Sequence, residues 1–181
     1  LPADLQCLHY LNLARNRLST LTPEAPLERL QYLDLTGNRM RDLSFLTRSQ
    51  NLTTLILRDN LSLGEASLQF PSFLTNLAHL DVGGSRLQTI AFDQPQLHLH
   101  TLLADGNRLT DFSFLTMLPN LTRLNLAANG LDTMTMPAGN LPALTSLTLS
   151  GNAFEDVTFL AAFPELSWLD LQGNQSALLI L

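Results

Sequence analysis

Leucines along the chain alternate with polar residues in short runs that return at a nearly constant interval. The recurring frame is Leu-x-x-Leu-x-Leu-x-x-Asn-x-Leu, seen for example at Leu121, Leu124, Leu126, Asn129 and Leu131. Eight copies span the chain, and their ninth positions lie 22, 22, 25, 22, 22, 23 and 22 residues apart. Chance clustering of leucine would not preserve this register, so the pattern predicts an array of structural repeats. The ninth positions are Asn16, Asn38, Asn60, Ser85, Asn107, Asn129, Asn152 and Asn174.

Each frame predicts a short β-strand with one buried face, because its two central leucines alternate with polar residues. A single repeat cannot bury its own apolar side, whereas stacked repeats bury one continuous core. The ninth-position asparagine has an amide with two donors and an acceptor, which can satisfy backbone groups left unpaired where the strand ends. We therefore predict a structural ladder formed by Asn16, Asn38, Asn60, Asn107, Asn129, Asn152 and Asn174, with the shorter Ser85 in one place.

The frame resembles that of the leucine-rich repeat family, and the resemblance covers essentially the whole chain. It implies an α/β repeat solenoid: a right-handed horseshoe with a parallel sheet on its concave face and short 3-10, helical or extended segments on its convex face. Residues 42–46, 111–115 and 156–160 each place an aspartate before a short apolar turn that it can cap, as in the internalin-type bacterial repeat of about 22 residues. A longer convex helix is expected around Ser67–Leu77, within the 25-residue repeat.

We expect residues 1–181 to form one domain of about eight repeats that is an excerpt of a longer chain. The terminal repeats of a solenoid need a polar cap, and residues 177–181 are apolar.

Composition and charge narrow the classes of function. The 181 residues carry a formal net charge of −6, which disfavours nucleic acid and anionic membrane surfaces as partners. No run of about 18 apolar residues occurs, so membrane insertion is not predicted. The single cysteine, Cys7, excludes an internal disulfide, and all ten basic residues are arginine. The sequence has no glycine-rich phosphate loop and no serine nucleophile elbow, and we predict no cofactor.

Residues between the buried leucines point outward on the concave face. Eight strands about 4.8 Å apart give a surface roughly 34 Å long, which suits a protein better than a small molecule. Aromatic residues favour binding hot spots, outward apolar residues often mark contacts, and the aspartates favour a partner with basic and apolar groups. The candidate protein-binding residues are Tyr10, Tyr32, Asp34, Ile56, Arg58, His79, Asp81, Leu103, Asp105, Arg123, Trp168 and Asp170.

A second set of side chains directly follows the ninth positions and lines one loop edge: Arg17, Arg39, Arg86 and Arg108. Arginine can contact carboxylates or phosphates there, although solubility at a rim is the interpretation we favour.

The sequence favours a non-catalytic module that recognises a protein partner through its concave face, on a secreted or cell-surface bacterial protein. An intracellular regulatory or scaffold domain, located in the cytoplasm, is the alternative. A hypothesis of a different class is a hydrolase or metal site at His79, Asp81 and His100, which lie on neighbouring strands. A further ligand and an enclosing cavity are not evident for that site, so we expect neither metal nor catalysis.

Overall fold

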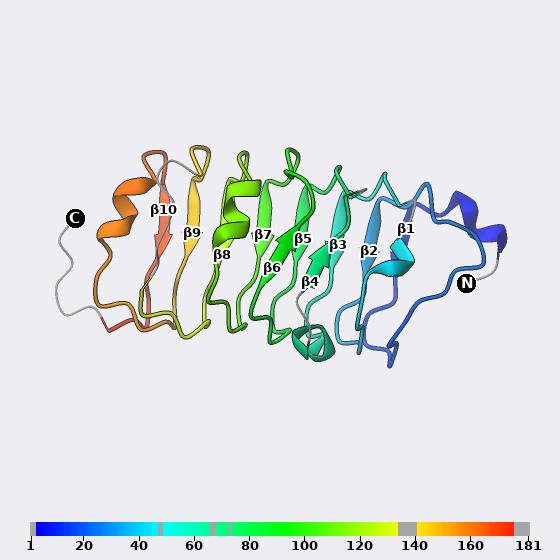
Figure 1. Ribbon diagram of the computed structural model, residues 1–181, viewed down its shortest axis with the longest axis horizontal. Helices are drawn as coiled ribbons and strands as arrows, with labels where there is room; N and C mark the ends of the chain where they lie inside the picture. Colours follow the sequence, from blue (N-terminus) through cyan, green and yellow to red (C-terminus); the bar gives the residue numbers. More distant parts are fainter. Residues whose placement is uncertain (1–2, 47–48, 66–67, 73, 134–140, 176–181) are drawn as a thin grey trace.

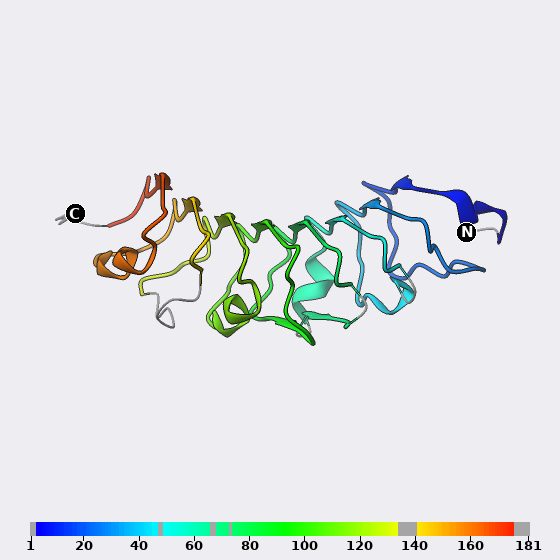
Figure 2. The ribbon, with the colours of Figure 1, turned by 90° about the horizontal axis from the view of Figure 1, so that it is seen from above.

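The computed structural model describes residues 3–46, 49–65, 68–72, 74–133 and 141–175. Its main element is an eight-stranded parallel sheet to which successive repeats contribute successive strands (Figure 1). Seen from above, the row of strands curves gently and the sheet lies on the inner side (Figure 2). The predicted solenoid with a parallel concave sheet is confirmed. The strand order is β1 (Tyr10–Asn12), β2 (Tyr32–Asp34), β3 (Thr54–Ile56), β5 (His79–Asp81), β7 (Thr101–Leu103), β8 (Arg123–Asn125), β9 (Ser146–Thr148) and β10 (Trp168–Asp170).

Equivalent residues of neighbouring repeats stack on one another. Leu33 on β2 pairs with Leu55 on β3, and Leu102 on β7 pairs with Leu124 on β8. All four leucines are fully buried, while their neighbours along each strand keep some exposure. Burial of one such side chain contributes about 1.5–3 kcal/mol, and the column of leucines supplies the continuous core that the period of the frame requires.

The ninth-position asparagines connect consecutive repeats through hydrogen bonds. The side-chain amide of Asn129 donates to the carbonyl oxygens of Ala104 and Leu126, both at 3.0 Å, and its oxygen accepts from the backbone N–H of Leu109 at 3.2 Å. Every asparagine of the row except Asn16 thus bridges its own repeat to the repeat before it, whereas Asn16 donates only within its own repeat. The buried members of this row are Asn38, Asn60, Asn107, Asn129 and Asn152, whereas Asn16 is exposed and Asn174 is half-buried at the ends of the sheet.

Ser85 takes the ninth position of the 25-residue repeat. Its hydroxyl accepts from the backbone N–H of Asn60 and lies 3.2 Å from the Leu57 carbonyl oxygen, to which it can donate. The 3-10 helix η3 (Leu61–Glu65) begins directly after Asn60. An added Cβ on Gly64 of this helix would lie 2.6 Å from the Ser85 carbonyl oxygen. In this longer repeat, the backbone of η3 at Gly64 therefore packs closely against the backbone at Ser85, where the short serine side chain replaces asparagine.

The convex side differs from the sequence prediction in this same repeat. The prediction of a helix around Ser67–Leu77 is wrong. Strand β4 (Leu68–Phe70) lies there and pairs in parallel with β6 (Ile90–Phe92). Leu68 and Phe70 are buried while Gln69 between them is exposed, a period of two that belongs to a strand. The rings of Phe70 and Phe92 stack with their centroids 5.0 Å apart, which fixes the register of the pair. Residues 67 and 73 lie outside the described segments.

Other convex segments form short 3-10 helices, each starting two residues after an aspartate. The carboxylates of Asp42, Asp111 and Asp156 accept a hydrogen bond from the first N–H of the helix at 3.0, 2.8 and 2.7 Å. The bonds from Ser44, led by its hydroxyl, lower the pKa of Asp42. Each aspartate therefore closes a turn that leads into the helix, one residue before the N-cap positions Phe112 and Val157 in the two helices where these are assigned. The helices are η2 (Ser44–Leu46), η4 (Ser113–Met117) and η5 (Thr158–Ala162), and η1 (Ala3–Cys7) precedes β1.

Candidate functional site

The outward side chains of the sheet form an aromatic pair at its beginning, an ionic network at its centre and an open hollow at its end. The aromatic pair is Tyr10 on β1 and Tyr32 on β2, whose rings stack in parallel with centroids 4.3 Å apart. Tyr10 is 58% exposed, so one ring face is available to a partner. Burial, followed by the negative charge of Asp34, raises the pKa of Tyr32, which therefore stays neutral at physiological pH.

The central network is built around Arg58, which lies just beyond β3. Its guanidinium binds both carboxylate oxygens of Asp105, at 3.0 and 2.7 Å, and donates to Asp81 through Nε at 3.0 Å. Asn125 donates to the same Asp105 carboxylate at 3.1 Å. The hydrogen bond to Asp105 is the main reason that the pKa of Arg58 is raised above its ordinary value. The network thus joins positions 58 and 105, which are two repeats apart.

Gly83 makes this reach possible. A Cβ built on Gly83 would lie 2.5 Å from Nη2 of Arg58 and 2.6 Å from its Cζ, so the guanidinium passes directly over the glycine. Any larger residue would displace the arginine. The sequence contains the signal for this contact, since Gly83 stands between Arg58 and Asp105 in the same outward column of successive repeats.

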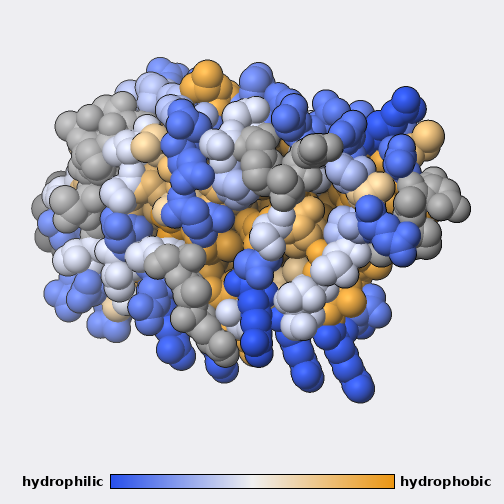
Figure 3. All heavy atoms as spheres, turned by 45° about the vertical axis from the view of Figure 1, so that its right-hand side comes forward, coloured by the Kyte–Doolittle hydropathy of each residue, from blue (hydrophilic) through white to orange (hydrophobic). Residues whose placement is uncertain are grey.

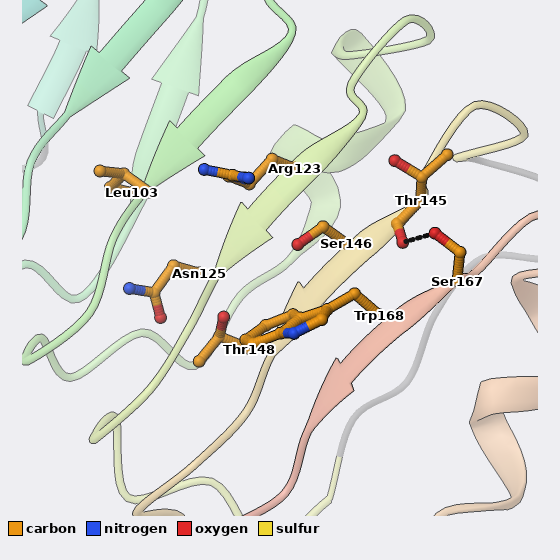
Figure 4. A pocket seen from close by; sticks show the side chains of 8 residues that line it. All are labelled: Leu103, Arg123, Asn125, Thr145, Ser146, Thr148, Ser167 and Trp168. Carbon is orange, nitrogen blue, oxygen red and sulfur yellow. Dashed lines mark hydrogen bonds between the residues drawn. The ribbon is translucent and has the colours of Figure 1, made fainter.

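The hollow lies over strands β7 to β10 and has a volume of about 510 Å³ (Figure 4). Arg123 and Trp168 stand on either side of Ser146, and Leu103 lies towards the preceding strands. Trp168 is 51% exposed, and Arg123 is exposed and forms no salt bridge with any described residue. An apolar ring, an aliphatic side chain and a guanidinium therefore face one open space. Its other lining residues, which the sequence analysis did not single out, are Asn125, Thr145, Ser146, Thr148 and Ser167.

Several of the candidate aspartates also have a structural role that the sequence analysis missed. One carboxylate oxygen of Asp34, of Asp81 and of Asp170 accepts a hydrogen bond from the backbone N–H two residues later, at 2.8, 2.9 and 2.9 Å. Such turns are typical of aspartate and asparagine, and the recurrence of these residue types in one column was the available signal. With Asp81 and Asp105 also bound to Arg58, fewer carboxylates face a partner than the sequence suggests.

The remaining candidates lie apart from these groups. Ile56 on β3 is half-buried, and so is His79 on β5. Burial is the main cause that lowers the pKa of His79, with Arg123 acting in the same direction and Asp81 against it. His79 is therefore neutral at pH 7.

The hydrolase hypothesis finds little support in this geometry. Asp81 is engaged by Arg58 and by the backbone, which leaves it poorly suited to orient a histidine. Within the described segments, no group of three or more histidine, cysteine, aspartate or glutamate side chains is placed to hold a metal ion. None of the helices in those segments is long and apolar enough to cross a membrane.

A second row of hydrogen bonds runs along the edge at which the strands begin. The amides of Asn51, Asn76 and Asn120 each donate to a backbone carbonyl oxygen of the preceding repeat, at 2.7, 2.8 and 2.8 Å. Each of these asparagines directly precedes the first leucine of a frame, a recurrence visible in the sequence. The concave surface is thus held between two rows of amide contacts, one at each end of the strands.

Comparison with known proteins identifies the family. The model described as "Zer-1-like, Leucine-rich repeats" matches residues 21–140, which is more than half of the chain. The chain belongs to the leucine-rich repeat family. Two further leucine-rich repeat models match residues 7–27 and 119–175. Domains of this family generally bind proteins.

The solved structure of an internalin from Listeria monocytogenes has the same fold. Its TM-score is 0.53 at 23% sequence identity, over 97% of this chain and 64% of that chain. The predicted internalin-like solenoid is therefore confirmed at the level of the fold.

Two larger proteins are similar in sequence. A Roc-COR-CHAT protease from an unknown prokaryotic organism is 34% identical over 120 residues, or 63% of this chain and 11% of that protein. The PH domain leucine-rich repeat protein phosphatase 1 of Rattus norvegicus is 30% identical over 150 residues, or 79% of this chain and 9% of that protein. The chain thus spans about a tenth of the length of the curated relatives it matches.

Proposed function

We propose that this domain is a non-catalytic recognition module that binds a protein partner through the concave face of its sheet. The observation that carries the proposal is the open hollow over β7 to β10, where Trp168, Leu103 and Arg123 face one space. Tryptophan and arginine are the residue types most enriched among binding hot spots. The partner is expected to insert an apolar side chain against Trp168 and to bring a carboxylate to Arg123.

The rigid centre of the face supports this arrangement. The central network ties Arg58, Asp81 and Asp105 together beside the hollow, so the sheet is preorganised before a partner arrives. The aromatic pair at β1 and β2 extends the candidate surface to the other end of the sheet. A partner that spans both ends must be a protein or a long peptide, because the sheet is roughly 34 Å long.

A secreted or cell-surface protein of a bacterium is the setting we favour, since the chain shares its fold with an internalin. The second candidate is an intracellular regulatory domain within a larger enzyme. It is favoured by the matched relatives, whose names are those of a protease and a phosphatase. A secretion signal in the full-length gene would support the first setting, and an attached enzyme domain would support the second.

A matched pair of bait proteins tests the binding surface. The sequence contains no lysine, so an amine-reactive biotin attaches at the amino terminus and not to side chains of the concave face. The site variant carries Leu103→Ser, Arg123→Gln and Trp168→Ala. The control variant is Leu97→Ser, because Leu97 is 54% exposed and its carbonyl oxygen lies at the strand-entry edge.

We expect a protein that the wild-type and control baits retain equally and that the site variant binds at least about tenfold more weakly. Loss of only two of the three contacts, at about 1 kcal/mol each, would already exceed that factor. Equal affinity for all three baits, with unchanged circular dichroism, would place the binding surface elsewhere on the domain.

A further inference from the structure

Six arginines line the edge at which the strands end, and none of them has an acidic partner within the described segments. All six are exposed, and the two salt bridges found among described residues both belong to Arg58. Figure 3 shows long hydrophilic side chains projecting from the lower edge of the molecule, the edge at which the sheet strands of Figure 1 end. The six are Arg15, Arg17, Arg39, Arg41, Arg86 and Arg108.

Two of these arginines occupy strained backbone positions. Arg15 and Arg86 have φ of 58° and 59°, in the left-handed region that favours glycine. The position equivalent to Arg15 is glycine in most repeats, for example Gly37, and the position equivalent to Arg86 is Gly130 in a later repeat. A non-glycine residue there costs about 1 kcal/mol. Solubility alone would not require arginine at these places, since an unstrained neighbouring position would serve equally well.

The same edge carries an exposed apolar residue among the arginines. Leu61 stands in one column with Arg39 before it and Arg86 after it, and it is 47% exposed. The column from Arg17 to Arg108 spans four repeat intervals, or about 19 Å at a strand spacing near 4.8 Å. Asp59 also lies on this edge, close to Gly84. A mixture of guanidinium, leucine and one carboxylate matches a protein segment better than a uniform polyphosphate.

We infer that this edge of the first five repeats is a second interaction surface, which binds an acidic protein segment carrying an apolar side chain against Leu61. The segment's carboxylates pair with Arg17, Arg39, Arg86 and Arg108, which occupy equivalent positions in their repeats. The net charge of −6 repels acidic molecules elsewhere on the domain, so the edge provides a local exception. This surface is separate from the hollow at Trp168, and either can fail without the other.

The test uses a fluorescein-labelled twelve-residue peptide of alternating glutamate and leucine, with binding followed by anisotropy at about 50 mM salt. The edge variant is Arg39→Gln with Arg86→Gln, on both sides of Leu61. The control is Arg29→Glu, an exposed residue that belongs neither to this edge nor to the hollow. Both variants change the net charge from −6 to −8, so a general electrostatic effect would weaken both equally.

We expect the edge variant to bind the peptide about fivefold more weakly and the control to bind it like the wild type. Leu61→Ser should also weaken binding, and a glutamate–serine peptide should bind less tightly than the glutamate–leucine peptide. No binding of the wild type up to 1 mM peptide, or an equal loss of affinity in the edge variant and in the Arg29→Glu control, would overturn the inference. Tighter binding of a twelve-nucleotide single-stranded DNA than of the peptide would overturn the assignment to a protein partner.

Arg86→Gly separates function from solubility. Glycine relieves the left-handed strain, so this variant should unfold at a higher urea concentration and yet bind the peptide more weakly. A variant that gains stability and keeps full peptide affinity would show that Arg86 takes no part in binding, and would contradict the inference.

Discussion

Replacing Gly83 with alanine tests whether Arg58 is held across the centre of the concave face. The new Cβ would lie 2.5 Å from Nη2 of Arg58, so the guanidinium must move away from Asp105. Gly83 itself is not in the left-handed region, and alanine fits its backbone conformation. Without Arg58, therefore, the substitution would remove only the conformational freedom of glycine from the unfolded chain.

The magnitudes follow from the contacts of Arg58. A hydrogen bond to a charged group contributes about 1.5–3 kcal/mol, but the Arg58 side chain is 32% exposed and solvent screens part of this. We expect Arg58→Ala to lower the free energy of unfolding by about 2 kcal/mol. Gly83→Ala should lower it by about 1–2 kcal/mol in the wild type. In the Arg58→Ala protein, Gly83→Ala should instead raise the free energy of unfolding by about 0.5–1 kcal/mol.

A double-mutant cycle measured by urea unfolding, with far-UV circular dichroism as the signal, tests these values. The expected coupling energy between positions 58 and 83 is about 2 kcal/mol. The slope of the unfolding free energy with urea should be the same in all four proteins, because repeat arrays can lose their cooperativity and the cycle depends on it. An identical effect of Gly83→Ala in both backgrounds would refute the geometry of the network.

Three further predictions concern other parts of the repeat. Asn129→Ala should lower the free energy of unfolding by about 1–3 kcal/mol in urea, because buried carbonyl oxygens lose their donor, and an unchanged midpoint would contradict this. Ala128→Gly should raise it by about 0.5–1 kcal/mol, because Ala128 has φ of 52°; a destabilised variant would disprove the strain. Burial lowers the pKa of His79 in the folded protein, so His79 stabilises the fold above about pH 6.5, and this stability is lost as the pH falls through the folded-state pKa. Between pH 7.5 and 5.5, the His79→Gln variant should therefore lose less unfolding free energy than the wild type. The same pH dependence of the unfolding free energy in both proteins would exclude this role.

The strands and the core could be predicted from the sequence because burial alone determines them. Leu124 and Leu126 have to point to the same side of a strand, and the constant interval between frames allows the repeats to stack in only one register. Asn129 then follows at the place where unpaired backbone groups need an amide. The apolar frame occurs eight times and its asparagine seven times, so each copy supports the assignment of the others.

Local exceptions were harder to predict. The run Leu68-Gln69-Phe70 is too short to distinguish a strand from one face of a helix by periodicity, and its pairing with β6 decides the outcome. The reach of Arg58 to Asp105 depends on the path of a long side chain, which no spacing rule encodes. Gly83 was a visible signal, but its meaning follows only once the arginine is seen above it.

Which residues of the concave face lie together also depends on contacts that the sequence pattern does not show. Leu103, Arg123 and Trp168 come from three strands, and the sheet brings them to one hollow. Asp34 and Asp81 look equivalent in sequence, yet Asp81 is buried and bound by Arg58 while Asp34 keeps partial exposure. Side-chain contacts between repeats, rather than the repeat pattern, therefore decide which positions remain open to a partner.

Hydroxyl-radical footprinting of the domain with and without its captured partner tests the binding surface most directly. Trp168 and Leu103 should be oxidised at least about threefold more slowly in the complex, because a partner in the hollow covers both side chains. Leu97, which is exposed at the strand-entry edge, should react at the same rate in both samples. Unchanged oxidation of Trp168 and Leu103 together with protection of Leu97 would contradict recognition through the concave face.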